Sequence, residues 1–171
     1  MLAVPHLRQQ TDWTCGPACV AMLLGYYGRN QGEMALADRL GADPENGVDP
    51  QPIVSYFRSE GYRTKTRFSM SLEDVSQCLA KGWPVMVAYQ DWAHRPSATN
   101  YHTCWDNGHY AIIAALEPDR LWLVDPSSDR PRRSLKTDDF IGRWRDLTKN
   151  GAQYRHWGLG VGPRKGGRRG S

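Results

Sequence analysis

The chain has 171 residues, of which 40% are hydrophobic and 23% charged, as is ordinary for one globular domain. It contains neither a long apolar span nor a basic leader followed by an apolar run. We therefore expect no membrane helix, no signal peptide and a cytoplasmic location, with leaderless export left open. Much of the net charge of +4 lies in the Gly/Arg-rich stretch GPRKGGRRGS. This pattern predicts a single domain over residues 1–160, a disordered basic tail over 161–171, and no nucleic-acid function.

The first predicted helix covers residues 15–27. Thr14 stands at its capping position, Pro17 lies in the first turn, and Gly28 supplies the stop. Helical spacing puts five residues on one buried face: Cys15, Cys19, Met22, Leu23 and Tyr26. This first helix is therefore predicted to be central to the core.

Three further helices are predicted over residues 32–42, 47–62 and 71–82. Asp49 is expected to cap the second of these before Pro50, while Ser71 and Asp74 resemble a capping box for the third. The region up to residue 82 is thus predicted to be largely helical.

The period then changes from helical to extended. Residues 83–90 predict a buried strand, residues 109–126 a β-hairpin and residues 153–161 a late strand. The segment 137–147 resembles a short surface helix. A long loop rich in aromatic residues, 91–107, joins the first strand to the hairpin. Helices first and antiparallel strands second predict the α+β class.

Four cysteines without a CxxC pair favour reduced thiols over a disulfide framework: Cys15, Cys19, Cys78 and Cys104. Cys15 stands at the helix start, where unpaired N–H groups and the helix dipole favour a thiolate. Cys19 and Cys78 lie on apolar helix faces and are expected to be core residues. Cys15 is therefore the candidate nucleophile.

A cysteine nucleophile needs a base and a group that orients the base. His109 opens an apolar strand, and Asp125 ends the return strand of the same hairpin. The two side chains share a face only if an odd-numbered loop or a bulge occurs at Glu117–Arg120. An amide for the oxyanion is available just upstream of the cysteine, from Gln9 or Gln10.

With these residues in place, the chain resembles the bacteriocin-processing cysteine peptidases. The resemblance rests on QQTDWTCGPACVAMLLGYYG, GHYAIIAAL and LWLVDPS, and it extends from about Val4 to Gly160. That family has a papain-like fold, with the catalytic cysteine at a helix start and an antiparallel sheet that carries His and Asp. Its members cut after double-glycine leaders and are usually fused to ABC transporters. The working residues of the family correspond to Gln9, Cys15, His109 and Asp125.

The chain departs from the transporter-linked members in two ways. Thr14 occupies the position where they usually carry Asp, and the loop 91–107 is extra. It is closer to the stand-alone relatives. The resemblance implies hydrolysis of a peptide or protein substrate through a Cys15 acyl-enzyme, which could be leader processing, with no cofactor and no metal. Aromatic and polar residues near the expected cleft are candidates for substrate binding: Trp13, Trp92, His102 and Trp105.

Three other hypotheses remain at this point. The same nucleophile would serve an acyltransferase, a deamidase or an effector that modifies a host protein. A non-catalytic peptide-binding module is a further alternative, disfavoured because both Cys15 and His109 are present. Four side chains are of the types that bind zinc, although their spacing matches no common ligand pattern for a zinc site: His94, His102, Cys104 and His109. The loop 91–107 is expected to act as a specificity lid, or else to extend the core with its aromatic residues.

Overall fold

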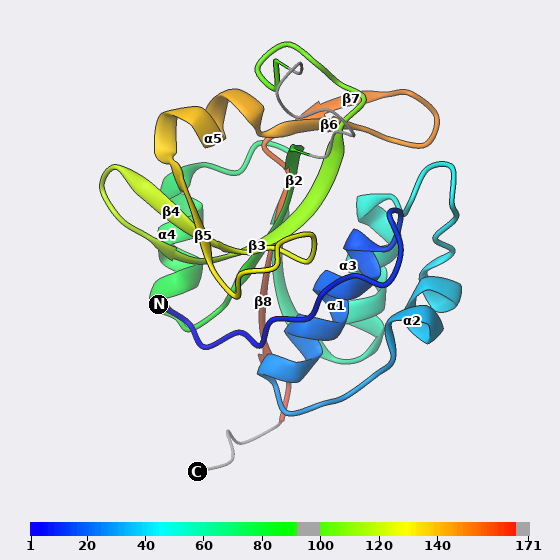
Figure 1. The fold of residues 1–171 in the computed structure, drawn as a ribbon. Helices are drawn as coiled ribbons and strands as arrows, with labels where there is room; N and C mark the ends of the chain where they lie inside the picture. Colours follow the sequence, from blue (N-terminus) through cyan, green and yellow to red (C-terminus); the bar gives the residue numbers. More distant parts are fainter. Residues whose placement is uncertain (92–99, 167–171) are drawn as a thin grey trace.

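Figure 1 shows the fold in the computed structural model, which describes residues 1–91 and 100–166. The helical part comprises α1 (Cys15–Tyr26), α2 (Glu33–Leu40), α3 (Pro50–Ser59) and α4 (Leu72–Ala80), with strand β1 (Tyr62–Arg67) before α4. The later part comprises β2 (Val85–Gln90), β3 (Gly108–Leu116), β4 (Arg120–Val124), β5 (Arg133–Lys136), α5 (Thr137–Arg143), β6 (Arg145–Leu147), β7 (Gln153–Arg155) and β8 (Gly158–Arg164). The predicted α+β class is confirmed.

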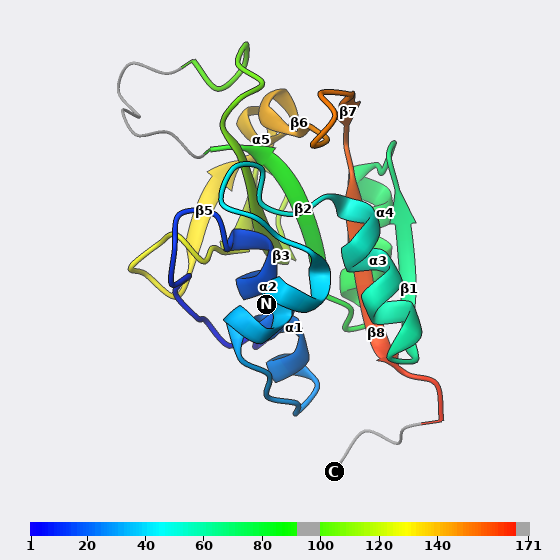
Figure 2. The ribbon, with the colours of Figure 1, turned by 90° about the vertical axis from the view of Figure 1, so that its right-hand side faces the viewer.

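The strands form a six-stranded antiparallel sheet in the order β1-β8-β2-β3-β4-β5, and β6 pairs with β7 separately. Helices α1 to α3 lie on one side of this sheet, and α4 and α5 lie on the other (Figures 1 and 2). All six residues of β2 are buried because both of its faces are covered. Met86 and Ala88 belong to the core under α1, whereas Val87 and Tyr89 belong to the core under α4 and α5.

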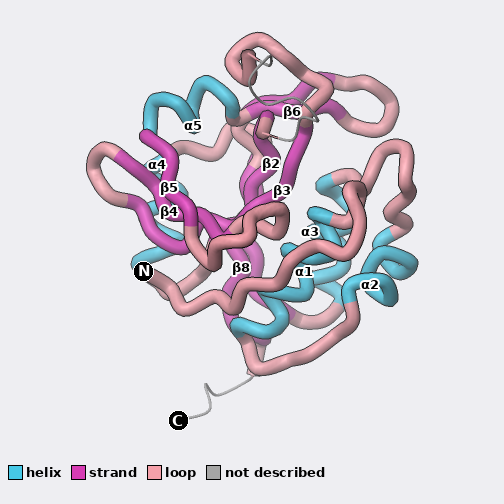
Figure 3. The backbone as a smooth tube through the Cα atoms, viewed as in Figure 1, coloured by secondary structure: helices cyan, strands magenta, loops and turns pink. Residues whose placement is uncertain are grey.

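Helix α1 is the central helix of the fold (Figure 3). All residues from Gly16 to Leu24 are buried, so the helix is covered on every side and not only on the predicted face. A side chain at Gly16 would collide with Val48 and Tyr110, which explains why nothing bulky follows Cys15. The helix therefore presents Cys15 from a rigid support.

Thr14, Asp49 and Ser71 all hold the N-cap positions that were predicted, but only Ser71 caps its helix with its side chain. The Thr14 side chain makes no capping bond to α1; its hydroxyl pairs with that of Thr11 at 2.9 Å. Asp49 likewise makes no side-chain cap, because its carboxylate accepts a bond from the Lys149 backbone N–H at 2.9 Å. The capping box of α4, which Ser71 opens, is present.

A bulge in β3 sets the register of the β3–β4 hairpin. Leu116 pairs with Leu121 near the turn, whereas Ile112 pairs with Val124 farther along, and the register shifts between Ile113 and Ala115. The shift of one residue satisfies the condition for His109 and Asp125 to share a face. The bulge lies in the strand and not in the turn at 117–120, where it was expected.

Other boundaries also differ from the sequence-based expectations. The late strand 153–161 is split into β7 and β8, because His156 adopts a φ of 52° between them. Strand β8 continues to Arg164, so the expected start of the tail at residue 161 is wrong; residues 167–171 lie outside the described part. Helix α5 is not merely a surface helix, because it buries Phe140 against Tyr89. In the described residues no helix has the length and apolarity needed to cross a membrane.

Candidate active site

His109 and Asp125 form a buried pair at one end of the β3–β4 hairpin. The imidazole Nε2 donates to Asp125 Oδ1 at 2.7 Å, and the two side chains are 1% and 0% exposed. His109 lies opposite Tyr89 of β2 in the sheet. The two predicted residues are thus brought together, on strands whose backbones are fixed by neighbours on both sides.

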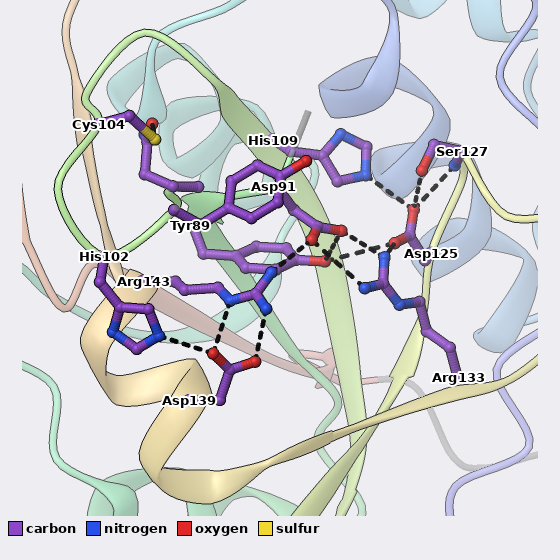
Figure 4. A network of polar contacts seen from close by, with 12 residues as sticks. Tyr89, Asp91, His102, Cys104, His109, Asp125, Ser127, Arg133, Asp139 and Arg143 are labelled. Carbon is purple, nitrogen blue, oxygen red and sulfur yellow. Dashed lines mark hydrogen bonds and ion pairs between the residues drawn. The ribbon is translucent and has the colours of Figure 1, made fainter. Parts of the chain in front are cut away.

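Asp125 is held by further donors after the strand ends at Val124. The backbone N–H and the hydroxyl of Ser127 both donate to Oδ1 at 2.8 Å (Figure 4). This is the turn that an Asp followed by Pro and Ser tends to form, since the carboxylate bonds to the backbone two residues on. The carboxylate is therefore oriented before any substrate arrives.

Each residue of the pair stabilises the charged form of the other. Burial alone would raise the pKa of Asp125, but the charge of His109 and its hydrogen bond, with the Ser127 and Arg133 contacts, lower that pKa below its usual range. Burial would likewise lower the pKa of His109, but the Asp125 charge and the contact with Cys15 raise it to about 10. At neutral pH the pair is an imidazolium beside a carboxylate.

Cys15 is the first residue of α1 and is half-buried. Its side chain is in hydrogen-bonding contact with His109, so a thiol, an imidazole and a carboxylate follow one another. Cys19, one turn later, is fully buried, and burial raises the pKa of its thiol well above the ordinary value. Cys78 is also in the core. These two thiols are therefore core residues, as expected.

The segment before Cys15 runs beside the Asp125 turn. The Gln9 backbone N–H donates to the Pro126 carbonyl at 2.9 Å, and the Gln9 side-chain Nε2 donates to the Thr11 carbonyl at 2.7 Å. An amide has two N–H groups, so one of them is left for a ligand. Gln10 is exposed, and its backbone bonds to Glu33. Of the two glutamines, Gln9 is thus the half-buried one that lies beside the Asp125 turn.

The residues expected to bind substrate lie in different surroundings. Trp13 is half-buried beside Cys15 in the sequence, and Trp92 falls outside the described residues. His102 Nε2 is 2.8 Å from Asp139 Oδ1 on α5. The guanidinium groups of Arg145 and Arg155 both lie over the Trp105 ring, 5.0 and 4.9 Å from its centre.

The described end of the loop therefore packs on α5 and on the β6–β7 hairpin, as the core-extension alternative predicts. The backbone agrees, because Arg145 donates to the Cys104 carbonyl at 3.1 Å. The zinc alternative finds no support in the described part of the chain, where no group of three His, Cys, Asp or Glu side chains is arranged to hold a metal ion. His94, one of the residues of that alternative, falls among the undescribed residues.

Sequence reasoning missed several residues around Asp125. Arg133 on β5 donates to Asp125 Oδ2 at 2.8 Å, and the Tyr89 hydroxyl lies 3.3 Å from the same oxygen. Asp91, which begins the long loop, contacts both of these residues. Ser127 carried a local signal in its spacing from Asp125, but Arg133 and Asp91 come close only through the folding of distant segments.

The family model described as "Peptidase_C39 like family" matches residues 1–152. The chain belongs to this family. An uncharacterized protein of Methanothermobacter thermautotrophicus is 30% identical to the C39-like chain over 138 residues, 80% of this chain and 82% of the relative. The lactococcin-G-processing and transport ATP-binding protein LagD of Lactococcus lactis is 25% identical over 138 residues. That match covers 81% of this chain and only 17% of LagD.

Solved structures have the same papain-like fold as the C39-like chain. A Bacillus anthracis protein assigned as a C39-like peptidase has a TM-score of 0.71 at 16% identity, with 95% of this chain and 96% of that chain covered. A double-glycine-motif protease of an AMS/PCAT transporter, solved with its leader peptide, has a TM-score of 0.65 at 16% identity, covering 95% and 93%. The peptidase domain of Streptococcus ComA gives 0.64 at 15% identity, covering 94% and 99%. The resemblance to a double-glycine leader peptidase family is confirmed.

Proposed function

We propose that the chain is a cysteine peptidase that cleaves a peptide bond through a Cys15 acyl-enzyme. The observation that carries the proposal is the buried His109–Asp125 pair at 2.7 Å, in contact with a cysteine at the start of a helix. A structural cysteine needs no partner of this kind. A charged imidazole that shares its other side with a thiol is the arrangement that activates a nucleophile.

The reaction follows from this geometry. The Cys15 thiolate attacks the carbonyl carbon of the scissile amide, and the carbonyl oxygen becomes an oxyanion. Because Nε2 is engaged by Asp125, the Nδ1 proton of His109 goes to the leaving amine as the C–N bond breaks. A water then gives a proton back to His109 and adds to the thioester carbon. Collapse of that second intermediate releases the carboxylic acid and restores the thiolate.

Two donors are proposed for the oxyanion: the Cys15 backbone N–H and the Gln9 side-chain Nε2. The first is one of the N–H groups that have no partner inside α1. The second is supported by the bond from Nε2 to the Thr11 carbonyl. This bond directs the amide nitrogen toward residues 11–14, the loop directly before α1, here called the α1 start loop. Donors fixed in advance stabilise the charge that develops on the oxygen without reorganising.

The substrate class proposed is an extended peptide, such as a leader sequence. The support comes from the names of the similar proteins, one of which processes lactococcin G and another of which was solved with a leader peptide. Four residues are proposed to contact that peptide: Trp13, Trp92, His102 and Trp105. His102 and Trp105 would contact the peptide from the part of the loop that packs on α5 and on the β6–β7 hairpin.

The test is alkylation by iodoacetamide at sub-stoichiometric reagent, followed by intact mass and peptide mapping. Cys104 is the internal control because it is half-buried like Cys15, and its thiol donates to the Gln90 amide oxygen at 3.4 Å, not to an imidazole. We expect one fast adduct, on Cys15, that disappears in Cys15→Ala and persists in Cys104→Ala. Equal, slow labelling of the two thiols would refute the proposal.

A further inference from the structure

We propose that Arg133 is a positioning residue that keeps Asp125 charged and directed at His109, by separating it from a second buried carboxylate, Asp91. This inference rests on the proposed function, since it concerns the same site. Arg133 does not touch the reacting atoms in this scheme; it acts through Asp125.

The two carboxylates share their partners (Figure 4). One guanidinium nitrogen of Arg133 donates to Asp125 Oδ2 at 2.8 Å and also to Asp91 Oδ2. The other terminal nitrogen lies 3.3 Å from Asp91 Oδ1. The Tyr89 hydroxyl lies 3.0 Å from Asp91 Oδ2 and 3.3 Å from Asp125 Oδ2. Asp91 and Asp125 are 9% and 0% exposed, so water contributes little to stabilising their charges.

The two oxygens of Asp125 have different tasks. Oδ1 accepts from His109 and from Ser127, whereas Oδ2 accepts from Arg133 and Tyr89. If Oδ2 lost its charged partner, the carboxylate would have a buried anionic oxygen held by a phenol alone. The carboxylate would then gain by taking a proton or by turning away from His109, because an unpaired buried charge is costly.

Like charges explain why an arginine is needed at this position. Two carboxylates that share one site cannot both ionise unless a cation compensates, and otherwise the pair keeps a proton. Arg143 of α5 donates to Asp91 Oδ1 at 2.9 Å, but it also binds Asp139, which in turn binds His102. Arg143 is thus already shared with another acid.

The remaining charged and titratable groups around Asp125 do not replace Arg133. His6 of the N-terminal segment bonds to the backbone carbonyl of Asp125 at 3.0 Å and not to its carboxylate. His109 and, behind it, Cys15 lie on the side of Oδ1. Arg133 is therefore the cation that the carboxylate pair has in common.

The experiment measures the second-order rate of Cys15 alkylation by iodoacetamide from pH 4 to 10, with melting temperature recorded at each pH. We compare wild type with Arg133→Met, which removes the charge, and with Arg133→Lys, which keeps it. Arg130→Met is the matched control, because Arg130 is exposed and, within residues 1–91 and 100–166, it bonds through its backbone N–H alone, to Ser128.

In Arg133→Met we expect the acid limb of the rate profile to move up by about one pH unit, which makes the reaction about tenfold slower at pH values well below the midpoint of that limb. The rates should converge near pH 8, where the carboxylate pair has lost its extra proton. Arg133→Lys and Arg130→Met should keep the wild-type acid limb.

Asp91→Asn supplies the decisive second variant. With no second carboxylate, the double variant Asp91→Asn/Arg133→Met should regain the wild-type acid limb, and it should fold even where Arg133→Met does not. An unchanged acid limb in folded Arg133→Met overturns the inference, as does a double variant whose acid limb stays shifted. Failure of the proposed function has another signature, since wild-type Cys15 would then be alkylated no faster than Cys104 at any pH.

Discussion

The carboxylate of Asp146 lies against the Cα of Gly108, the residue directly before His109. A side chain at residue 108 would collide with both carboxylate oxygens of Asp146. The Asp146 carboxylate accepts from the Leu147 N–H at 2.8 Å and from the Gln90 amide at 3.2 Å. It therefore cannot shift away from residue 108 unless strand β6 moves. Strand β6 is thereby packed against the strand that carries the proposed base.

We expect Gly108→Ala to lower the free energy of unfolding by about 1–3 kcal/mol, as overpacking does in a tight site, and to slow Cys15 alkylation by displacing His109. Urea denaturation and intact-mass kinetics measure the two effects. The double variant Gly108→Ala/Asp146→Ala relieves the collision, so it should be more stable than the sum of the single changes predicts. Additive losses would mean that the close contact is unimportant.

Asp146 also makes stability depend on pH. Burial raises the pKa of its carboxyl to about 7, against the hydrogen bonds from Leu147 and Gln90 that lower it. A carboxyl whose folded pKa is raised contributes stability below its unfolded pKa of about 4, and this is lost as pH rises through 7. Asp146→Asn should therefore be more favourable relative to wild type at pH 8 than at pH 4.5. Urea denaturation at the two pH values would give equal differences if Asp146 does not titrate in this range.

The local part of the site could be predicted from the sequence, and the non-local part could not. Cys15, His109 and Asp125 each lie at the end of an element with a clear signal, a helix start or a strand of a hairpin. Arg133 sits in the short polar strand RSLK, which shows no apolar alternation, and it reaches Asp125 only because β5 pairs with β4. Asp91 directly follows β2, but the two arginines that hold its carboxylate, Arg133 of β5 and Arg143 of α5, come from distant parts of the chain.

The same distinction explains the errors in the fold. The capping box of α4 is a contact within four residues, and it was predicted correctly. Thr14 and Asp49 hold N-cap positions, but their side-chain oxygens bond elsewhere: Thr14 pairs with Thr11 just before it, and Asp49 accepts from the distant Lys149 N–H. The break between β7 and β8 at His156 follows from the stacking of its ring on Trp144, with ring centres 4.9 Å apart. This is a tertiary contact, so the local sequence pattern does not predict the break.

Gln9 and Gln10 offer a matched pair for the oxyanion proposal. Gln9→Ala should slow hydrolysis of a peptide carrying a double-glycine cleavage site by about 10²–10³-fold, the usual effect of losing one oxyanion donor. Alkylation of Cys15 by iodoacetamide should be unchanged in the same variant, because displacement of iodide forms no oxyanion. Gln10→Ala should alter neither rate. If Gln9→Ala lost both activities together, its role would be to hold the α1 start loop.

His109 and Asp125 should differ in the severity of their loss. His109→Ala removes the proton donor and acceptor, so single-turnover acylation should fall to the level of Cys15→Ala. Asp125→Asn keeps an oxygen for the Nε2–H but removes the charge that raises the pKa of His109. Its acylation rate should therefore fall less than that of His109→Ala. The alkaline limb of the acylation profile, where the imidazolium proton is lost, should move to lower pH. Equal losses in the two variants would assign Asp125 more than an orienting role.

Trp105 tests whether the described end of the loop is an anchor or a binding surface. The guanidinium groups of Arg145 of β6 and Arg155 of β7 lie over its ring. Two such cation–π contacts, with the buried ring area, should contribute about 1–3 kcal/mol. Trp105→Ala should therefore lower the melting temperature clearly. His102 is the control, because it is half-exposed and its contact with Asp139 lies near the surface, where such a pair is worth at most about 1 kcal/mol. His102→Ala should leave the melting temperature nearly unchanged and raise KM if the loop contacts the peptide. A stable Trp105→Ala protein with altered peptide preference would instead make Trp105 part of the binding surface, since an anchoring side chain cannot be removed without cost.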